Sequence, residues 1–290
     1  MYETDGPASN VRPLGESGYA DAAQELPFLT GNSADRQEGV HACHRRGQEL
    51  IPGCRHGIHG MRGSRQVSDA TGEDPLKLLV FVGTEGKYHD HEQNGRFLTS
   101  MLSGSMLSGS KRIDASFSRD YEVLATGLSL FEAVLFYTDV GELTNTQERG
   151  LLSFVDSGGG FFGLHTAAAS FRECEGYHRM LNGFFNGHSP HMKFTVTVSD
   201  PGDPITEGLA DFEVTDELYY LKHDPGKSHH LLQAYDETRD ETHVMAFKHT
   251  CGEGRVFFFA LGHDMAVLEN PNFQQVVLRG ALWVGWRLAG

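Results

Sequence analysis

A glycine-rich stretch at residues 157–169 constrains the fold of this 290-residue chain more than any other segment. Apolar residues spaced along one face of a helix precede it, at Leu151, Leu152 and Val155. Three consecutive glycines, 158–160, then favour the left-handed backbone that ends a helix. Residues 161–164 have the apolar character of a short buried strand, and Thr166 begins the next predicted helix. The stretch therefore predicts a strand between two helices, with His165 at the corner where the strand ends.

The corner position makes His165 a candidate functional residue. In a parallel α/β sheet, ligands bind at the carboxyl ends of the strands, and a sharp strand-to-helix turn can expose a reactive side chain there. The alternative interpretation is a glycine-rich turn whose histidine only caps or packs. Two further histidines, His89 and His263, also follow predicted strands, and this repetition favours the functional interpretation.

Strand-like and helical segments alternate along most of the chain. Nearly continuous apolar runs, as expected of buried parallel strands, lie at residues 76–83, 133–138 and 255–260. Helices are predicted at residues 93–107, 166–181 and 273–288, and a further one begins at Thr144. This alternation predicts an α/β fold in which a mostly parallel central sheet lies between helices, a three-layer sandwich.

Residues 1–74 differ from this body in composition. They are rich in polar residues and glycine and have neither helical nor strand periodicity, so we interpret them as a disordered or poorly ordered extension. The folded domain is predicted to span residues 75–290. The extension contains a Cys/His cluster whose spacing fits no standard zinc pattern; its members are His41, Cys43, His44, Cys54, His56 and His59.

The charge of the chain argues against two classes of partner. A formal net charge of −15 and a pI near 5.4 disfavour nucleic acid and anionic membranes, both of which need a basic surface. No apolar run approaches the length of about 18 residues that spans a bilayer, and no secretory signal is visible. Four cysteines do not form a disulfide framework, and Cys174 and Cys251 are expected to be reduced. These features predict a cytoplasmic protein.

Several motifs together resemble the ThuA-like (trehalose utilisation) family. They are Gly-Gly-Gly-Phe-Phe-Gly-Leu-His-Thr-Ala-Ala at 158–168, Asp-Glu-Leu-Tyr at 216–219, Gly-Glu-Gly-Arg-Val-Phe at 252–257 and Leu-Gly-His-Asp at 261–264. The resemblance covers roughly residues 76–288 and implies the flavodoxin-like fold of class I glutamine amidotransferases. One departure is visible: where the family usually reads Asp-His-Pro-Ile-Thr, this chain has Asp203 in place of the histidine.

Amidotransferases of this fold carry a cysteine nucleophile in a Gly-x-Cys-x-Gly turn. The corresponding residues here, 163–167, have His165 at the cysteine position, and Cys174 lies too far along the chain to replace it. Glutamine hydrolysis through a thioester is therefore excluded. An imidazole at that corner can instead act as a general base, a proton shuttle or a metal ligand.

Histidines and carboxylates are expected to converge at the sheet edge. The residues predicted to be catalytic are His165, Glu217 and His263. Residues expected to contact the substrate are His89, His188, Asp216, Tyr219 and Asp264. Such a set suits either acid–base chemistry on a polyhydroxylated substrate or a divalent metal held by nitrogen and oxygen ligands. No cofactor follows from the residues alone, and a divalent metal is the candidate.

The family resemblance implies a role in handling disaccharides or their keto derivatives. The leading hypothesis is an enzyme, a hydrolase, lyase or isomerase of keto-glycosides, in which His165 and Glu217 move protons next to a carbonyl group. A second hypothesis is a non-catalytic protein that binds a sugar or a partner through the same residues, and a third is a metal-dependent hydrolase of another substrate. The expected partner is a small carbohydrate, and a homo-oligomer is compatible with the sequence.

Overall fold

The structure is a computed structural model that describes residues 74–83, 88–104, 113–139 and 141–289. All of them belong to one compact unit. The predicted extension, residues 1–74, lies outside the described residues except for residue 74, and so does its Cys/His cluster.

Within the described residues the main sheet has nine strands in the order β2-β1-β3-β4-β11-β10-β9-β6-β7. The first five pair in parallel, and four of them follow the order 2-1-3-4 of flavodoxin-like sheets. They are β2 (Ile113–Ser118), β1 (Leu76–Phe81), β3 (Ala133–Phe136), β4 (Gly160–Leu164) and β11 (Gly254–Phe259). The predicted α/β fold with a parallel central sheet is confirmed.

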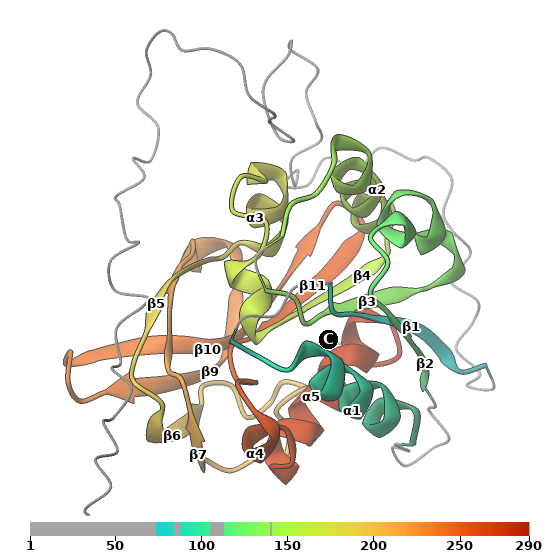
Figure 1. Ribbon diagram of the computed structural model, residues 1–290. Helices are drawn as coiled ribbons and strands as arrows, with labels where there is room; N and C mark the ends of the chain where they lie inside the picture. The colour runs from blue at the N-terminus through green and yellow to red at the C-terminus, as the bar shows by residue number, and fades with distance from the viewer. Residues whose placement is uncertain (1–73, 84–87, 105–112, 140, 290) are drawn as a thin grey trace, which may run out of the picture. The chain divides into compact units, whose positions relative to one another are not determined.

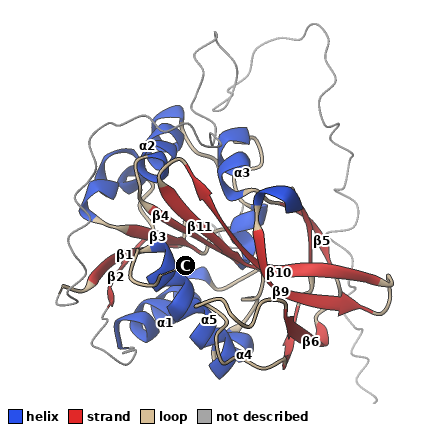
Figure 2. Cartoon of the chain, turned by 180° about the vertical axis from the view of Figure 1, so that it is seen from behind, coloured by secondary structure: helices blue, strands red, loops and turns tan. Residues whose placement is uncertain are grey.

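The other four strands extend this sheet in antiparallel fashion. They are β10 (Glu241–Cys251), β9 (His229–Asp236), β6 (Met192–Val198) and β7 (Phe212–Asp216). Seen from behind, the hairpin of β9 and β10 projects away from the parallel strands (Figure 2). A separate antiparallel pair consists of β5 (Phe184–His188) and β8 (Tyr219–Lys222).

Helices cover both faces of the parallel strands (Figure 1). On one face lie α2 (Asn145–Asp156) and α3 (Glu175–Leu181), and on the other α1 (His91–Gly104) and α5 (Pro271–Val284). A short helix, α4 (Met265–Leu268), follows the β11 loop, and single helical turns occur at Val123–Gly127, Leu128–Leu130, His165–Ala169 and Pro225–Lys227. Among the described helices, none combines the length and the apolar character needed to cross a membrane.

The core between these layers is rich in phenylalanine. On one face of β4, Phe161 packs edge-on against Tyr177 of α3, and both are fully buried. On the other face, the rings of Phe162 and Phe257 lie 4.8 Å apart under α5. A Cβ at Gly280 of α5 would lie 2.4 Å from the Phe257 ring, so a glycine there lets the helix approach the sheet closely.

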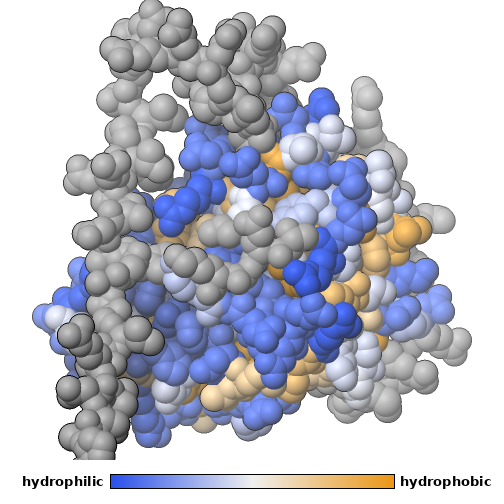
Figure 3. Space-filling view, viewed as in Figure 1, coloured by the Kyte–Doolittle hydropathy of each residue, from blue (hydrophilic) through white to orange (hydrophobic). Residues whose placement is uncertain are grey.

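Hydrophilic residues predominate on the molecular face shown in Figure 3.

The glycine-rich stretch forms the predicted helix end and the predicted strand. Thr144 caps α2 in a capping box, α2 ends at Asp156, and Gly158 has a positive φ of 101°. The predicted continuous helix over 166–181 is wrong, because the segment consists of the turn His165–Ala169 and the separate helix α3. The chain is extended at Ser170, whose hydroxyl lies 2.7 Å from that of Thr138 on the neighbouring strand end.

One expectation about the cysteines is corrected. Cys251, at the end of β10, is disulfide-bonded rather than reduced. Cys174 is buried at the start of α3. The cytoplasmic location inferred from the sequence stays a prediction.

Candidate metal centre

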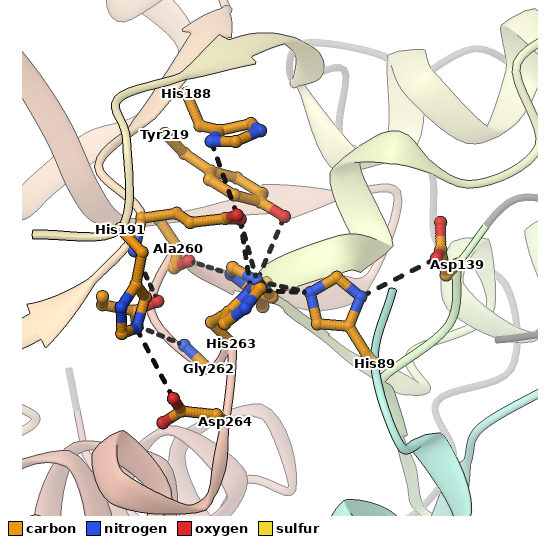
Figure 4. A network of polar contacts seen from close by, with 12 residues as sticks. His89, Asp139, His188, His191, Tyr219, Ala260, Gly262, His263 and Asp264 are labelled. Atoms are coloured by element: carbon orange, nitrogen blue, oxygen red, sulfur yellow. Dashed lines mark hydrogen bonds and ion pairs between the residues drawn. The ribbon is translucent and has the colours of Figure 1, made fainter. Parts of the chain in front are cut away.

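The carboxyl ends of four parallel strands, β1, β3, β4 and β11, meet at one edge of the sheet. The side chains that follow these strands lie close together; they are His89, Asp139, His165 and His263. Glu217, in the connection between β7 and β8, and Tyr219, the first residue of β8, approach from the other side. Figure 4 shows His89 reaching His263 across the site, with Asp139 on the far side of His89. The convergence expected from the sequence is present in the structure.

His165 has a fixed tautomer. Its ring is fully buried, and its Nδ1 lies 2.6 Å from the carbonyl oxygen of Ala260. A carbonyl oxygen only accepts hydrogen bonds, so Nδ1 carries the proton and Nε2 keeps its lone pair. The backbone φ of His165 is 47°, in the left-handed region. Residues other than glycine rarely adopt this region, but a sharp strand-to-helix turn can require it.

Four potential ligand atoms surround one point, and all lie within 4.8 Å of one another. His89 Nε2 is 3.2 Å from His165 Nε2 and 3.1 Å from His263 Nδ1. Glu217 Oε2 is 3.3 Å from His263 Nδ1 and 3.9 Å from His165 Nε2. Ligands of a tetrahedral zinc ion with bonds of about 2.0 Å are separated by about 3.3 Å. The spacing of the four atoms therefore fits a first-row divalent ion.

Protons on the side chains do not satisfy all of these contacts. If His89 Nε2 is unprotonated, its lone pair faces that of His165 Nε2. If His89 Nε2 is protonated, its N–H faces His263 Nδ1. A protonated His263 Nδ1 then opposes that N–H, whereas an unprotonated His263 Nδ1 turns its lone pair toward the Glu217 carboxylate. With His165 neutral and Glu217 ionised, one pair of like groups meets in either case. A cation at the centre removes the conflict, because all four atoms then direct a lone pair at it.

The charge states of Glu217 and His165 favour metal binding, whereas the raised pKa of His263 opposes it, so an ion must displace the proton of His263. Burial opposes ionisation of Glu217, but the hydrogen bond and positive charge of His263 outweigh it and lower the pKa of the carboxyl group. Burial, followed by the proximity of His89, holds the pKa of His165 well below its ordinary value. The hydrogen bond with Glu217 raises the pKa of His263, against the effect of burial. An ionised carboxylate and a neutral imidazole are the forms that ligate metals.

Tyr219 lies against His165. Its ring stacks on the imidazole with centroids 4.3 Å apart, and its hydroxyl is 3.1 Å from His165 Nε2. Burial, and then the charges of Glu217 and Asp216, raise the pKa of Tyr219 well above its ordinary value. The hydroxyl therefore stays protonated and can donate a hydrogen bond at the centre of the site.

Asp216 lies behind the site rather than on its surface. The residue is fully buried, and its two carboxylate oxygens accept hydrogen bonds from the backbone N–H groups of Glu217, at 2.7 Å, and Gly262, at 2.8 Å. Burial raises the pKa of Asp216 to about 7, although these hydrogen bonds oppose the shift. The side chain thus connects the two loops that present Glu217 and His263, and this placement favours a positioning role over direct contact with a substrate.

The more exposed side of the site carries three polar residues. His188 Nδ1 donates to the carbonyl of Ser189 at 2.7 Å and lies 3.5 Å from Glu217 Oε1. His191 Nε2 is 3.5 Å from Asp264 Oδ2, and both side chains are about two-fifths exposed, at 39% and 42%. Asp264 also caps α4 through Oδ1. These residues are the ones that solvent and a small molecule reach first.

The structure adds Asp139 to the site and places Asp203 outside it. Asp139, which sequence analysis missed, follows β3 and places Oδ2 3.7 Å from His89 Nδ1. Its position directly after a buried apolar run was the available signal. Asp203, the departure from the family pattern, is not part of this cluster: it forms an ion pair with Lys248 and accepts a hydrogen bond from the backbone of Ile205.

Comparison with known proteins gives a family and a fold. The family model for ThuA, described as trehalose utilisation, matches residues 77–284. A ThuA-like protein of Parabacteroides merdae is similar in structure, with a TM-score of 0.64 and 21% identity over 73% of this chain and 90% of that one. A ThuA-like protein of Bacteroides uniformis has a TM-score of 0.58 and 18% identity over 72% and 91% of the two chains.

A more distant structure is a cytoplasmic protein of Salmonella typhimurium, with a TM-score of 0.52 and 13% identity over 72% of this chain and 99% of that one. No curated protein matches the chain. At these levels of identity the structural similarities show a shared fold and nothing about the reaction.

Proposed function

The chain belongs to the ThuA (trehalose utilisation) family, and from this membership and the geometry of the site we propose that it is a metal-dependent enzyme acting on a carbohydrate. The substrate we propose is a disaccharide or a keto-glycoside. The observation that carries the proposal is the convergence of His89, His165, His263 and Glu217 on one point, with contacts that protons alone do not satisfy.

The proposed ligands have separate roles. His165 contributes Nε2 because its Nδ1 proton is held by Ala260, and its complete burial favours ligation over direct proton transfer to a substrate. Glu217 supplies the negative charge and His263 the most accessible nitrogen. A divalent ion bound there would polarise a carbonyl or hydroxyl oxygen and acidify a water molecule.

Proton transfer to the substrate is assigned to the exposed side. His188 lies next to Glu217, and the pair of His191 and Asp264 lies on the other side of His263. From the buried side, the hydroxyl of Tyr219, held in its protonated form next to His165 Nε2, would donate a hydrogen bond to an oxygen atom of the substrate. A keto-sugar suits this arrangement because its carbonyl and neighbouring hydroxyl oxygens can approach a metal together while its other hydroxyls bond to the exposed imidazoles and carboxylate.

The test is turnover of defined sugars by the full chain after chelation and after reloading with Zn²⁺, Mn²⁺ or Co²⁺. Trehalose, sucrose and their 3-keto derivatives would be followed by NMR. We expect turnover that needs metal and that Glu217→Gln abolishes, whereas Glu213→Gln, the same change at an exposed residue of β7, retains it. Full activity in the chelated protein would contradict the proposal. A sugar that raises Tm without turnover would support the non-catalytic alternative instead.

A further inference from the structure

A second group of polar side chains lies next to the proposed metal centre, on the other side of the His89 ring. It consists of His89 Nδ1, His91 and Asp139, whose ligand atoms lie within 4.8 Å of one another. The side chains of His89 and Asp139 are 6% and 1% exposed, and His91 is 6% exposed. Figure 4 shows Asp139 on the side of His89 that faces away from His263.

These side chains carry polar atoms without hydrogen-bond partners. Among the described residues, His89 Nδ1, both ring nitrogens of His91 and Asp139 Oδ2 are buried and make no hydrogen bond. An unsatisfied buried polar group costs about 1–3 kcal/mol, and such groups are rare in native proteins. Four of them in one place indicate that a bound species belongs between the three side chains.

The chemistry of the three groups selects a cation. A carboxylate oxygen and two imidazole nitrogens are a common ligand set for zinc and similar divalent ions. An anion would be repelled by the Asp139 carboxylate. His91 is the first residue of α1, so a rigid element holds its ring, and the ring packs 5.1 Å from that of Tyr137, centroid to centroid.

We propose that His91, Asp139 and His89 Nδ1 form a second divalent-metal site, so that the His89 ring bridges two ions. This inference rests on the proposed metal centre, because the two sites share His89. Binding at both ring nitrogens requires His89 to release its N–H proton to solvent. With metal–nitrogen bonds of about 2.0 Å on each side of the ring, the two ions lie about 6 Å apart.

Metal stoichiometry tests the inference without any measurement of activity. The chelated full chain would be equilibrated with Zn²⁺, freed of excess ion and analysed for bound metal. We expect two ions per chain in the wild type and one in His91→Gln, with two retained in His249→Gln, which changes a histidine outside both groups. Asp139→Asn provides a second variant, conservative in size, with the same expected loss of one ion.

Electron paramagnetic resonance of the Cu²⁺-loaded protein gives an independent reading. Two ions bridged by one imidazole ring are magnetically coupled, whereas His91→Gln should give the spectrum of an isolated ion. One ion per chain in both wild type and His91→Gln would overturn the second site and leave the proposed function intact. No bound ion in the wild type would overturn both. One ion in wild type and none in either variant would mean that a single ion sits on the Asp139 side of His89, and this too would overturn the bridge.

Discussion

The Asp216 carboxylate accepts two backbone hydrogen bonds, and the effect of its substitution on stability can be predicted from their loss. Asp216→Asn keeps the shape of the side chain but replaces one acceptor oxygen by an NH₂ group. Because the two oxygens accept from the N–H groups of Glu217 and Gly262, the amide must direct its NH₂ at one of these donors. The Asp216 side chain is fully buried, so water does not replace the lost hydrogen bond.

Loss of one such bond costs about 1–3 kcal/mol, but a neutral amide also removes the burial penalty that raises the pKa of Asp216, so we expect the free energy of unfolding to fall by about 1 kcal/mol. The loops that carry Glu217 and His263 should also loosen, since Asp216 is bonded to both. Disturbance of groups that orient metal ligands lowers affinity by about 10- to 100-fold. We expect about 10-fold weaker Zn²⁺ binding.

Urea denaturation of the chelated full chain, followed by circular dichroism, measures the first effect, and calorimetric titration with Zn²⁺ measures the second. Asp211→Asn is the matched control, because that exposed carboxylate accepts a single backbone N–H, from Val198, which an amide oxygen can also accept. Its effect should stay within about 0.5 kcal/mol. If Asp216→Asn behaves like Asp211→Asn in both assays, the positioning role argued for Asp216 is wrong.

Three further changes have defined outcomes. Gly262→Ala should lower stability by about 1–2 kcal/mol in urea denaturation, because φ is 143° and the new Cβ would lie 3.0 Å from the Cβ of His165; Gly202→Ala, in an exposed turn, should not. Tyr219→Phe should keep the metal content measured by elemental analysis and lower turnover at least about 10-fold, and unchanged turnover would remove the donor role. Thr144→Ala should cost about 1 kcal/mol of stability by loss of the α2 cap, with turnover unaffected.

The sequence was sufficient to predict the convergence of the histidines. Three glycines that end a helix, followed by an apolar run, locate His165 at a strand end by local rules alone. His89 and His263 follow similar runs, and the carboxyl ends of parallel strands meet at one edge of a sheet. Glu217 and Tyr219 could be added only through the family resemblance, since they lie on an antiparallel excursion whose path the local pattern does not define.

The features that the sequence did not predict depend on contacts between residues that lie far apart in the chain. The break at Ser170 follows from its hydrogen bond with Thr138, 32 residues earlier, which no helical periodicity reports. The tautomer of His165 is set by the Ala260 carbonyl, 95 residues away. Likewise, the inward orientation of Asp216 separates it from its neighbour Glu217, although the sequence predicted that both carboxylates would face the substrate, Glu217 as a catalytic residue and Asp216 as a binding residue.

The central claim is that three histidines and a glutamate hold a divalent ion at the sheet edge. Titration of the chelated full chain with Co²⁺, followed by visible absorption, tests it most directly, because Co²⁺ reports both binding and the geometry of its ligands. We predict saturable binding with the intense bands of a low-coordinate nitrogen–oxygen site in the wild type and in His249→Gln, and at least about 10-fold weaker binding in His165→Gln. Identical titration curves for His165→Gln and the wild type would contradict the claim.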